Sequence, residues 1–222
     1  MNIIYILLST ISLTIASYNP QPTLWPIEFI ITFQSNITVT IDQPVVPVNG
    51  ISYYDWTLKA QRIEHDPGAY ECTNFYATNQ SCTEYFLPDG LYRVLQAPTE
   101  GQEECCLDMP GIGALPPDWA SSTNPTYNGV TTELYSGLDA KKWTFDNFPN
   151  TTNPHMYFEV DSGPYMGFPL LFTFPAVDGR QDFYYDPASM KVGPVDDSLF
   201  ELPEGCEGKL CSTSLRRGNI VP

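Results

Sequence analysis

Apolar and polar residues alternate over several short stretches of this chain, and this alternation limits the fold more than any other feature of the sequence. Between Ile27 and Gln34 every second residue is apolar, which gives one face carrying Ile27, Phe29, Ile31 and Phe33. A period of two is typical of a β-strand with one buried face, because successive side chains of a strand point to opposite sides. Helical periodicity is hard to find by comparison.

The same alternation returns along the rest of the chain. It continues at Asn36–Ile41, and the short join at Ser35 predicts a hairpin between these first two strands. Further strands are expected at Ile51–Trp56, Gln61–His65, Ala69–Tyr76, Cys82–Phe86, Leu91–Leu95, Lys142–Phe145, His155–Val160, Pro169–Phe174 and Gln181–Asp186. About ten or eleven short strands at hairpin spacing predict a mainly β protein, with a large antiparallel sheet curved into a half-barrel or closed.

A long stretch over residues 109–135 breaks this pattern. It is rich in Pro, Gly, Ser and Asn, but it also carries Trp119 and Tyr127. Long loops within a compact domain are usually functional or disordered, and the aromatic residues favour an ordered segment here. We therefore expect a lid over the apolar face of the sheet, with a short helix near Pro117–Trp119.

The N-terminal residues of the chain predict export. Residues 1–16 form an apolar run that ends in small residues, as a secretory signal peptide does. The run is short for a bilayer, which takes roughly 20 residues, and no later stretch is apolar enough to span one. We expect a single domain over residues 17–205 and a cysteine-containing tail over residues 206–222. The protein would be secreted or held in a lumen of the secretory–lysosomal pathway.

Glycosylation motifs and cysteines agree with that route. Three sequons predict N-glycans on Asn36, Asn79 and Asn150. The six cysteines predict disulfides, because an even number in an oxidising compartment favours bonds over free thiols.

The adjacent pair Cys105–Cys106 suggests how these bonds connect. A bond between neighbours is strained, so each of the two is expected to bond outward, one to the earlier strands and one to the tail. The remaining cysteines are Cys72 and Cys82 on predicted strands, and Cys206 and Cys211 in the tail.

The charge of the chain restricts its partners. A formal net charge of −16, from 26 acidic and 10 basic residues, argues against binding to nucleic acid or to anionic membrane surfaces. Aromatic residues make up 14 % of the chain, which indicates a folded domain rather than a disordered acidic tail. Asp196 and Asp197 are calcium candidates, although no calcium-loop motif surrounds them, and no other cofactor is expected.

Motifs for catalysis are missing from the sequence. It contains no nucleophile elbow, no H-E-x-x-H and no glycine-rich phosphate loop. The only histidines are His65 and His155, which excludes a three-histidine metal site within one chain. Paired carboxylates such as Glu64 and Asp66 leave a glycan-acting hydrolase as an alternative, because that chemistry uses two carboxylates. We expect a protein that is not an enzyme.

Asp55 lies among three aromatic residues in the run Tyr53-Tyr54-Asp55-Trp56. A hairpin over the following turn would bring Asp55 opposite Arg62, whose guanidinium matches a carboxylate. We expect a structural ion pair that fixes the register of this hairpin, with recognition of a ligand headgroup as the alternative.

A series of features occurs in one order along residues 25–186. They are Tyr53-Tyr54-Asp55 followed by Arg62-Ile63, then Tyr70-x-Cys72, Cys105-Cys106, Pro117-Asp118-Trp119, Tyr127-Asn128-Gly129, Trp143, Tyr157-Phe158-Glu159 and Gly167-Phe168-Pro169. This order resembles the ependymin-related proteins and a looser set of plant and protist secreted proteins. The resemblance implies a half-barrel similar to the bacterial lipoprotein carriers, with a lidded cavity that binds a lipid or another hydrophobic ligand, and with calcium sometimes involved.

An aromatic-rich face on a curved sheet must be covered by a lid, a ligand or a partner. The expected cavity lining consists of Phe29, Ile31, Phe33, Tyr53, Trp119, Phe158, Phe172, Phe174 and Phe183. The same side chains could equally form a filled core. The alternative from another class is an extracellular structural or assembly protein of a coat or surface filament, which associates with itself or with a partner protein.

Overall fold

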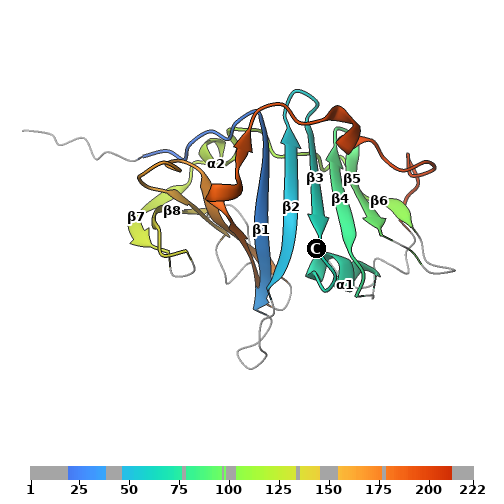
Figure 1. The fold of residues 1–222 in the computed structure, drawn as a ribbon, viewed down its shortest axis with the longest axis horizontal. Helices are drawn as coiled ribbons and strands as arrows, with labels where there is room; N and C mark the ends of the chain where they lie inside the picture. Colours follow the sequence, from blue (N-terminus) through green and yellow to red (C-terminus); the bar gives the residue numbers. More distant parts are fainter. Residues whose placement is uncertain are drawn as a thin grey trace, which may run out of the picture.

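The alternating stretches form one antiparallel sheet, which has twelve strands among the described residues of this computed structural model. Figure 1 shows how the sheet curves. The structure describes residues 20–38, 47–76, 79–96, 98, 104–133, 136–145, 155–176 and 179–211. The predicted fold class, a large curved antiparallel sheet with little helix, is confirmed. The predicted signal peptide and the sequon at Asn150 lie outside the described residues.

Strand β1 lies in the middle of the sheet, and the chain builds outward from it in two halves. The first half runs from β1 (Glu28–Thr38) through β2 (Val48–Asp55), β3 (Ala60–His65), β4 (Cys82–Leu87) and β5 (Gly90–Leu95) to β6 (Cys105–Pro110) at one edge. The second half starts at the opposite edge with β7 (Thr126–Thr132) and returns through β8 (Asp139–Phe145), β9 (His155–Val160), β10 (Pro169–Ala176) and β11 (Gly179–Tyr185). Strand β12 (Lys191–Val192) also pairs with β1. The sheet is therefore an open half-barrel.

Residues 111–125 connect the two edges of the sheet, and we call this segment the crossover. It contains the short helix α2 (Trp119–Ser122), where the sequence predicted a helix. The Trp119 ring lies 5.5 Å from the ring of Phe145 on β8 and 5.6 Å from that of Trp25, which in turn lies 5.8 Å from Tyr54 on β2. Neighbouring strands are about 4.8 Å apart, and β2 and β8 are not neighbours in the sheet. Rings from these two strands can therefore share the same partners only because the sheet curves around them.

Two secondary-structure predictions are wrong. No hairpin lies at Ser35, because β1 runs unbroken through it and pairs Ser35 with Val48 on one side and Phe183 on the other. The predicted strand over Ala69–Tyr76 is the helix α1 (Tyr70–Tyr76). Ala69, just before the helix, and Cys72 and Tyr76 within it are buried at helical spacing, and they pack against the sheet beside Leu95.

The three disulfides connect differently from the prediction. Cys72 on α1 bonds to Cys82 on β4, and both members of the adjacent pair bond to the tail, as Cys105–Cys206 and Cys106–Cys211. The prediction that Cys105 and Cys106 bond outward is confirmed, whereas the expected bond to the earlier strands is wrong. Leu107, the residue after this pair on β6, also contacts the tail. Its N–H donates to Lys209 O at 2.6 Å, and Cys211 N–H donates to Leu107 O at 3.0 Å. The tail therefore covers the β6 edge.

Part of the convex face, over the first half of the sheet, is covered by residues 193–211, which we call the C-terminal strap. It contains the 3-10 helix η2 (Asp197–Phe200), and Val195 and Phe200 pack over Ala60. A second 3-10 helix, η1 (Pro187–Ser189), precedes β12. In the part of the chain that the structure describes, no helix has the length and apolar character needed to cross a membrane.

Candidate functional site

The concave face is the first candidate site. Aromatic side chains fill the half of this face that lies next to the crossover. Trp119 of the crossover contacts Phe172 at 4.8 Å and Tyr157 at 5.4 Å between ring centroids. Tyr54 hydroxyl donates to Leu115 O at 2.7 Å, which holds the crossover against the sheet. All of these aromatic side chains are buried, so this half of the face is a filled core.

A second cover was not predicted from the sequence. Residues 20–26, the N-terminal segment, place Trp25 beside Trp119, and Trp25 N–H donates to Pro117 O at 3.0 Å. Glu159, which is fully buried, accepts hydrogen bonds from the Thr23 backbone N–H at 2.8 Å and from the Thr23 hydroxyl at 3.0 Å. Burial raises the pKa of Glu159, although Thr23 and Lys141 oppose the shift. The N-terminal segment is thus fixed to β9 and forms the lid together with the crossover.

Four rings continue the concave face below this lid, and we call them the aromatic band: Phe33, Phe174, Phe183 and Tyr185. Phe33 lies 5.5 Å from Phe183 and 6.1 Å from Tyr185, and Phe174 lies 5.6 Å from Phe183. Three of the four are only half-buried, although they point to the inner face of the sheet; Phe33 alone is buried. The aromatic band is therefore a part of the concave face where aromatic rings stay partly exposed.

The aromatic band lies between the lid and α1. Along β11 the inward-facing side chains are Tyr185, Phe183 and then Gln181, which contacts Glu71 of α1. Phe33 needs a glycine on the next strand, because a Cβ at Gly50 would lie 2.2 Å from its ring. At the centre of the lid, Trp119 Nε1 is buried and has no hydrogen-bond partner among the described residues.

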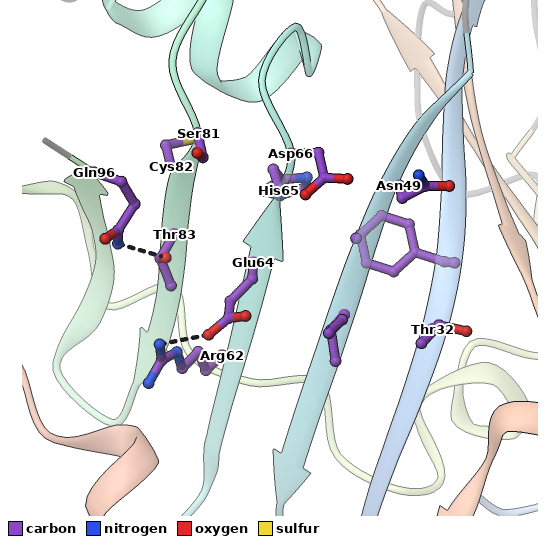
Figure 2. Close-up of a pocket in the computed structure, with 13 residues that line it drawn as sticks. Thr32, Asn49, Arg62, Glu64, His65, Asp66, Ser81, Cys82, Thr83 and Gln96 are labelled. Carbon is purple, nitrogen blue, oxygen red and sulfur yellow. Dashed lines mark hydrogen bonds and ion pairs between the residues drawn. The ribbon is translucent and has the colours of Figure 1, made fainter.

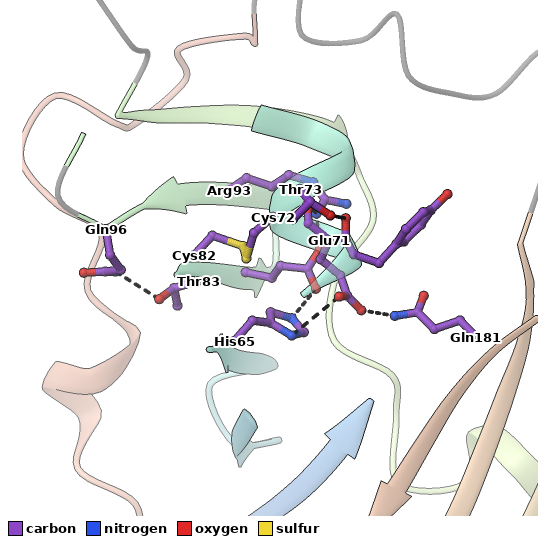
Figure 3. The surroundings of a disulfide bond; sticks show 11 residues. His65, Glu71, Cys72, Thr73, Cys82, Thr83, Arg93, Gln96 and Gln181 are labelled. Carbon is purple, nitrogen blue, oxygen red and sulfur yellow. Dashed lines mark hydrogen bonds and ion pairs between the residues drawn. A yellow bond between two sulfur atoms is a disulfide. The ribbon is translucent and has the colours of Figure 1, made fainter. Parts of the chain in front are cut away.

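A buried ion-pair network closes the lower end of the concave face, as Figure 3 shows. His65 Nε2 lies 3.2 Å from Glu84 Oε2, and His65 Nδ1 lies 3.7 Å from Glu71 Oε2. Arg93 pairs with Glu84 and, at 2.9 Å, with Asp108. Because α1 carries Glu71 and is bonded to β4 through Cys72, the network joins the helix to four neighbouring strands of the first half, β3 to β6.

The network holds its proton on His65. Burial alone would lower the pKa of His65, but the negative charges of Glu71 and Glu84 outweigh burial and raise it. Burial alone would raise the pKa of Glu84, but Arg93 and His65 lower it to about 2. The folded state therefore favours the protonated imidazole of His65 between the two carboxylates. No group of three His, Cys, Asp or Glu residues that could hold a metal ion occurs within the described ranges.

The convex face carries a second candidate site, a groove of about 470 Å³ shown in Figure 2. Its side chains come from one register row, Thr32, Ile51, Glu64 and Thr83, and from the residues around that row. The rest of its lining includes the polar residues Asn49, Arg62, His65, Asp66, Ser81 and Gln96, together with Phe33, Gly50 and Cys82. Glu64 and Asp66, the acidic pair considered for a hydrolase, both line this groove.

The structure divides the nine predicted lining residues between the two faces. Phe29, Ile31, Trp119 and Phe172 lie in the filled core of the concave face, and three others belong to the aromatic band. Tyr53 lies on the convex face near Phe200, and Phe158 lies there in a cluster with Leu171. Tyr185 was left out of the predicted lining, although it alternates with Phe183 along β11.

The predicted ion pair between Asp55 and Arg62 does not form. Asp55 lies opposite Ala60 and accepts hydrogen bonds from Thr57 N–H at 2.7 Å and Leu58 N–H at 3.2 Å, so its carboxylate is used by the turn. Arg62 pairs instead with Glu64 at 2.5 Å. The prediction failed because a turn inside the hairpin offers the carboxylate closer donors than the guanidinium does.

The remaining predicted residues occupy the surface. Asp196 is exposed and accepts from Ser198 N–H at 3.0 Å, so it caps η2, while Asp197 is exposed beside it. Asn79 is exposed in the turn after α1, whereas Asn36 is half-buried within β1 and its Oδ1 is buried. Of the two sequons that the structure describes, the one at Asn79 has the accessible acceptor.

The comparisons with known proteins give no family and no function. No family model matches the chain, and no curated protein matches it. Among solved structures, an uncharacterized conserved protein from Thermus thermophilus matches with a TM-score of 0.49 and 12 % sequence identity, covering 82 % of this chain and 88 % of that one. The resemblance to the ependymin-related proteins therefore remains a prediction from the sequence features.

Proposed function

We propose that the protein is a secreted or luminal carrier that binds a lipid or another hydrophobic ligand on the concave face of its half-barrel and catalyses no reaction. The observation that carries this proposal is the aromatic band, where Phe174, Phe183 and Tyr185 point inward but stay half-buried. Soluble proteins rarely leave contiguous apolar surface uncovered without a use for it. Three disulfides and the predicted signal peptide support the secretory setting.

The expected binding strength follows from area. If a ligand removes about 300 Å² of aromatic and aliphatic surface from water, the gross gain is about 7 kcal/mol at about 25 cal/mol per Å², before the entropic costs of association. Such a gain suits reversible binding. The hydroxyl of Tyr185 lies in the same band, where burial raises its pKa, so it stays neutral and can hydrogen-bond a carboxyl or ester group of the ligand.

A titration with the fluorescent fatty acid dansyl-undecanoic acid tests the proposal. Saturable binding is expected, and Phe183→Asn should weaken it about ten-fold, because a polar side chain then interrupts the band. The matched control is Tyr184→Asn, since Tyr184 is the next residue on β11, is also half-buried and faces the opposite side. Absence of binding by the unchanged protein, or equal weakening by both variants, would exclude the concave face as the ligand site.

A second candidate function, an extracellular assembly protein, is favoured by the edge strand β7. This strand pairs only with β8 within the described part of the chain, it carries no charged residue, and Val130 is 53 % exposed. Bare, uncharged edges are templates for strand pairing between copies. Light scattering at rising concentration tests this function: self-association that Val130→Lys abolishes supports it, and a monomer at every concentration contradicts it.

A further inference from the structure

The groove on the convex face has a composition that neither the lid nor the aromatic band explains. It mixes donors from Arg62, Asn49 and Gln96 with acceptors from Glu64 and Asp66. Hydroxyl groups of Thr32, Ser81 and Thr83 add partners that both donate and accept. Some of these groups already pair with one another, Gln96 with Thr83 at 3.1 Å and Arg62 with Glu64. Their remaining donors and acceptors favour a polar ligand over an apolar one.

Arg62 is fixed in place at this groove. Its Nη1 donates to Leu199 O at 3.0 Å, its Nη2 pairs with Glu64, and the guanidinium lies between the rings of Tyr53 and Tyr85 at 5.7 Å and 5.3 Å. One donor, Nε, is buried and has no hydrogen-bond partner among the described residues. A rigid arginine is a preorganised group for recognition, because little rotamer entropy is lost on binding.

The charges of the groove select the class of ligand. The groove has two carboxylates and one guanidinium, so its charge disfavours an anionic ligand. The described residues form no cluster of three that could hold a metal cation. A neutral polyhydroxylated ligand fits, since each hydroxyl can donate to Glu64 or Asp66 and accept from Arg62, Asn49 or Gln96. Sugars are such ligands.

One source of sugar begins at the rim of this groove. Asn79 is exposed, and the hydroxyl residue of its sequon, Ser81, lines the groove. The Asn79 side chain lies over Gly68, where a Cβ would come within 3.2 Å of its Oδ1. Gly68 is two residues beyond Asp66, another groove residue, so a sugar attached to Asn79 would begin beside the groove.

We propose that the groove on the convex face binds pyranose sugars, and that its resident ligand is the protein's own N-glycan on Asn79. The first sugars would lie against β3 and β4 and mask the polar row that includes Glu64 and Thr83. This inference shares with the proposed function only the secretory route, and it is independent of ligand binding on the concave face.

Glycan processing in the full-length protein secreted from eukaryotic cells provides the first test. Native treatment with peptide N-glycosidase should release the Asn79 glycan slowly, and the variant Gln96→Ala should speed this release several-fold by opening the groove. Gln96 is exposed, so the fold tolerates the change. The matched control is Met166→Ala, an exposed residue between β9 and β10 in the other half of the sheet, and it should leave the rate unchanged. Equal rates in all three proteins, or an Asn79 that carries no glycan, would overturn the proposal.

Titration with free chitobiose, followed by NMR or calorimetry, separates the two sources of sugar. Asn79→Gln protein should bind chitobiose, whereas the glycosylated protein should not, because its groove is occupied. Equal binding by both proteins would assign the groove to glycans of other molecules and refute the resident glycan. No binding by Asn79→Gln protein would refute the sugar site itself. If the protein did not bind dansyl-undecanoic acid but still released the Asn79 glycan slowly, only the proposed function would be refuted.

Discussion

Gln181 on β11 donates a hydrogen bond to the buried carboxylate of Glu71 on α1, although the two residues are 110 positions apart in the sequence. This bond joins the second half of the sheet to the helix that closes the first half. It also completes the wall below the aromatic band, because Glu71 in turn faces His65. The lower end of the concave face is therefore held by a polar contact, while its upper end is held by aromatic packing.

Gln181→Ala should lower the free energy of unfolding by about 1–3 kcal/mol, because the variant leaves a buried carboxylate oxygen without its donor. The measurement is urea unfolding followed by tryptophan fluorescence. Gln34→Ala is the control: Gln34 also donates through its side chain, to Asn49 at 3.0 Å, but that bond is exposed and its loss should change stability little. Equal losses of stability in both variants would show that the buried hydrogen bond to Glu71 contributes no more than the exposed one to Asn49.

Stability should fall as the pH rises above about 6.5. The folded state raises the pKa of His65, so its contribution is fully present below the unfolded pKa of about 6.5 and is lost as the pH rises through the folded value. Unfolding free energies from pH 6 to pH 9 measure this effect. His65→Gln should remove much of the decline, and an unchanged slope in that variant would contradict the assignment.

Acidification below about 6.5 should also lower stability, for the opposite reason. Burial lowers the pKa of His155 to about 4, so the unfolded chain takes up a proton that the folded chain refuses. Stability should therefore decrease from about pH 6.5 toward pH 4, and His155→Gln should flatten this limb while leaving the alkaline limb intact. Each histidine variant is therefore the control for the other. If both variants changed the same side of the profile of stability against pH, the assignment of the two sides to His65 and His155 would be wrong.

Trp119→Ala should destabilise the fold by about 3–5 kcal/mol, because a buried aromatic ring is replaced by a cavity at the centre of the lid. Thermal unfolding and urea unfolding both report the loss. Met166→Ala provides the comparison, since that side chain is 63 % exposed and its truncation should have little effect. A small change on removing Trp119 would mean that the lid is loosely packed.

Removing the Cys106–Cys211 bond by a double change to serine should cost about 4 kcal/mol, because the bond closes a long loop in the unfolded chain. It should also promote association, since the tail no longer covers the β6 edge. Denaturant unfolding and analytical ultracentrifugation measure the two effects. The double change at Cys72 and Cys82, which are only 10 residues apart, should cost less and leave the monomer intact.

The sheet was predictable because its signal is local. Alternation at Phe29, Ile31 and Phe33 requires one buried face, whatever lies opposite. The error at Ser35 arose because Ser35 and Asn36 are both common in turns. The apolar residues before and after them occupy the same odd-numbered positions, which is also what one continuous strand requires.

The site was less predictable because it depends on long-range pairing. Register decides that Tyr53 faces the strap while Tyr54 faces Trp25, and the sequence gives both the same aromatic character. Helix α1 was missed because it is only seven residues long, and its helical spacing becomes visible only with the disulfide to Cys82. The network around Glu84 and Arg93 could not be foreseen, since polar residues on a strand usually mark its solvent face.

The connection of the tail to β6 has a consequence for synthesis in the cell. Strands β1 to β6 can pair in the order in which they leave the ribosome, so Cys105 and Cys106 are in place long before their partners exist. Until Cys206 and Cys211 arrive, the nascent protein displays two neighbouring thiols beside an unprotected strand edge. The two bonds to the tail can therefore form only after synthesis has passed Cys206 and Cys211, so the β6 edge is closed last.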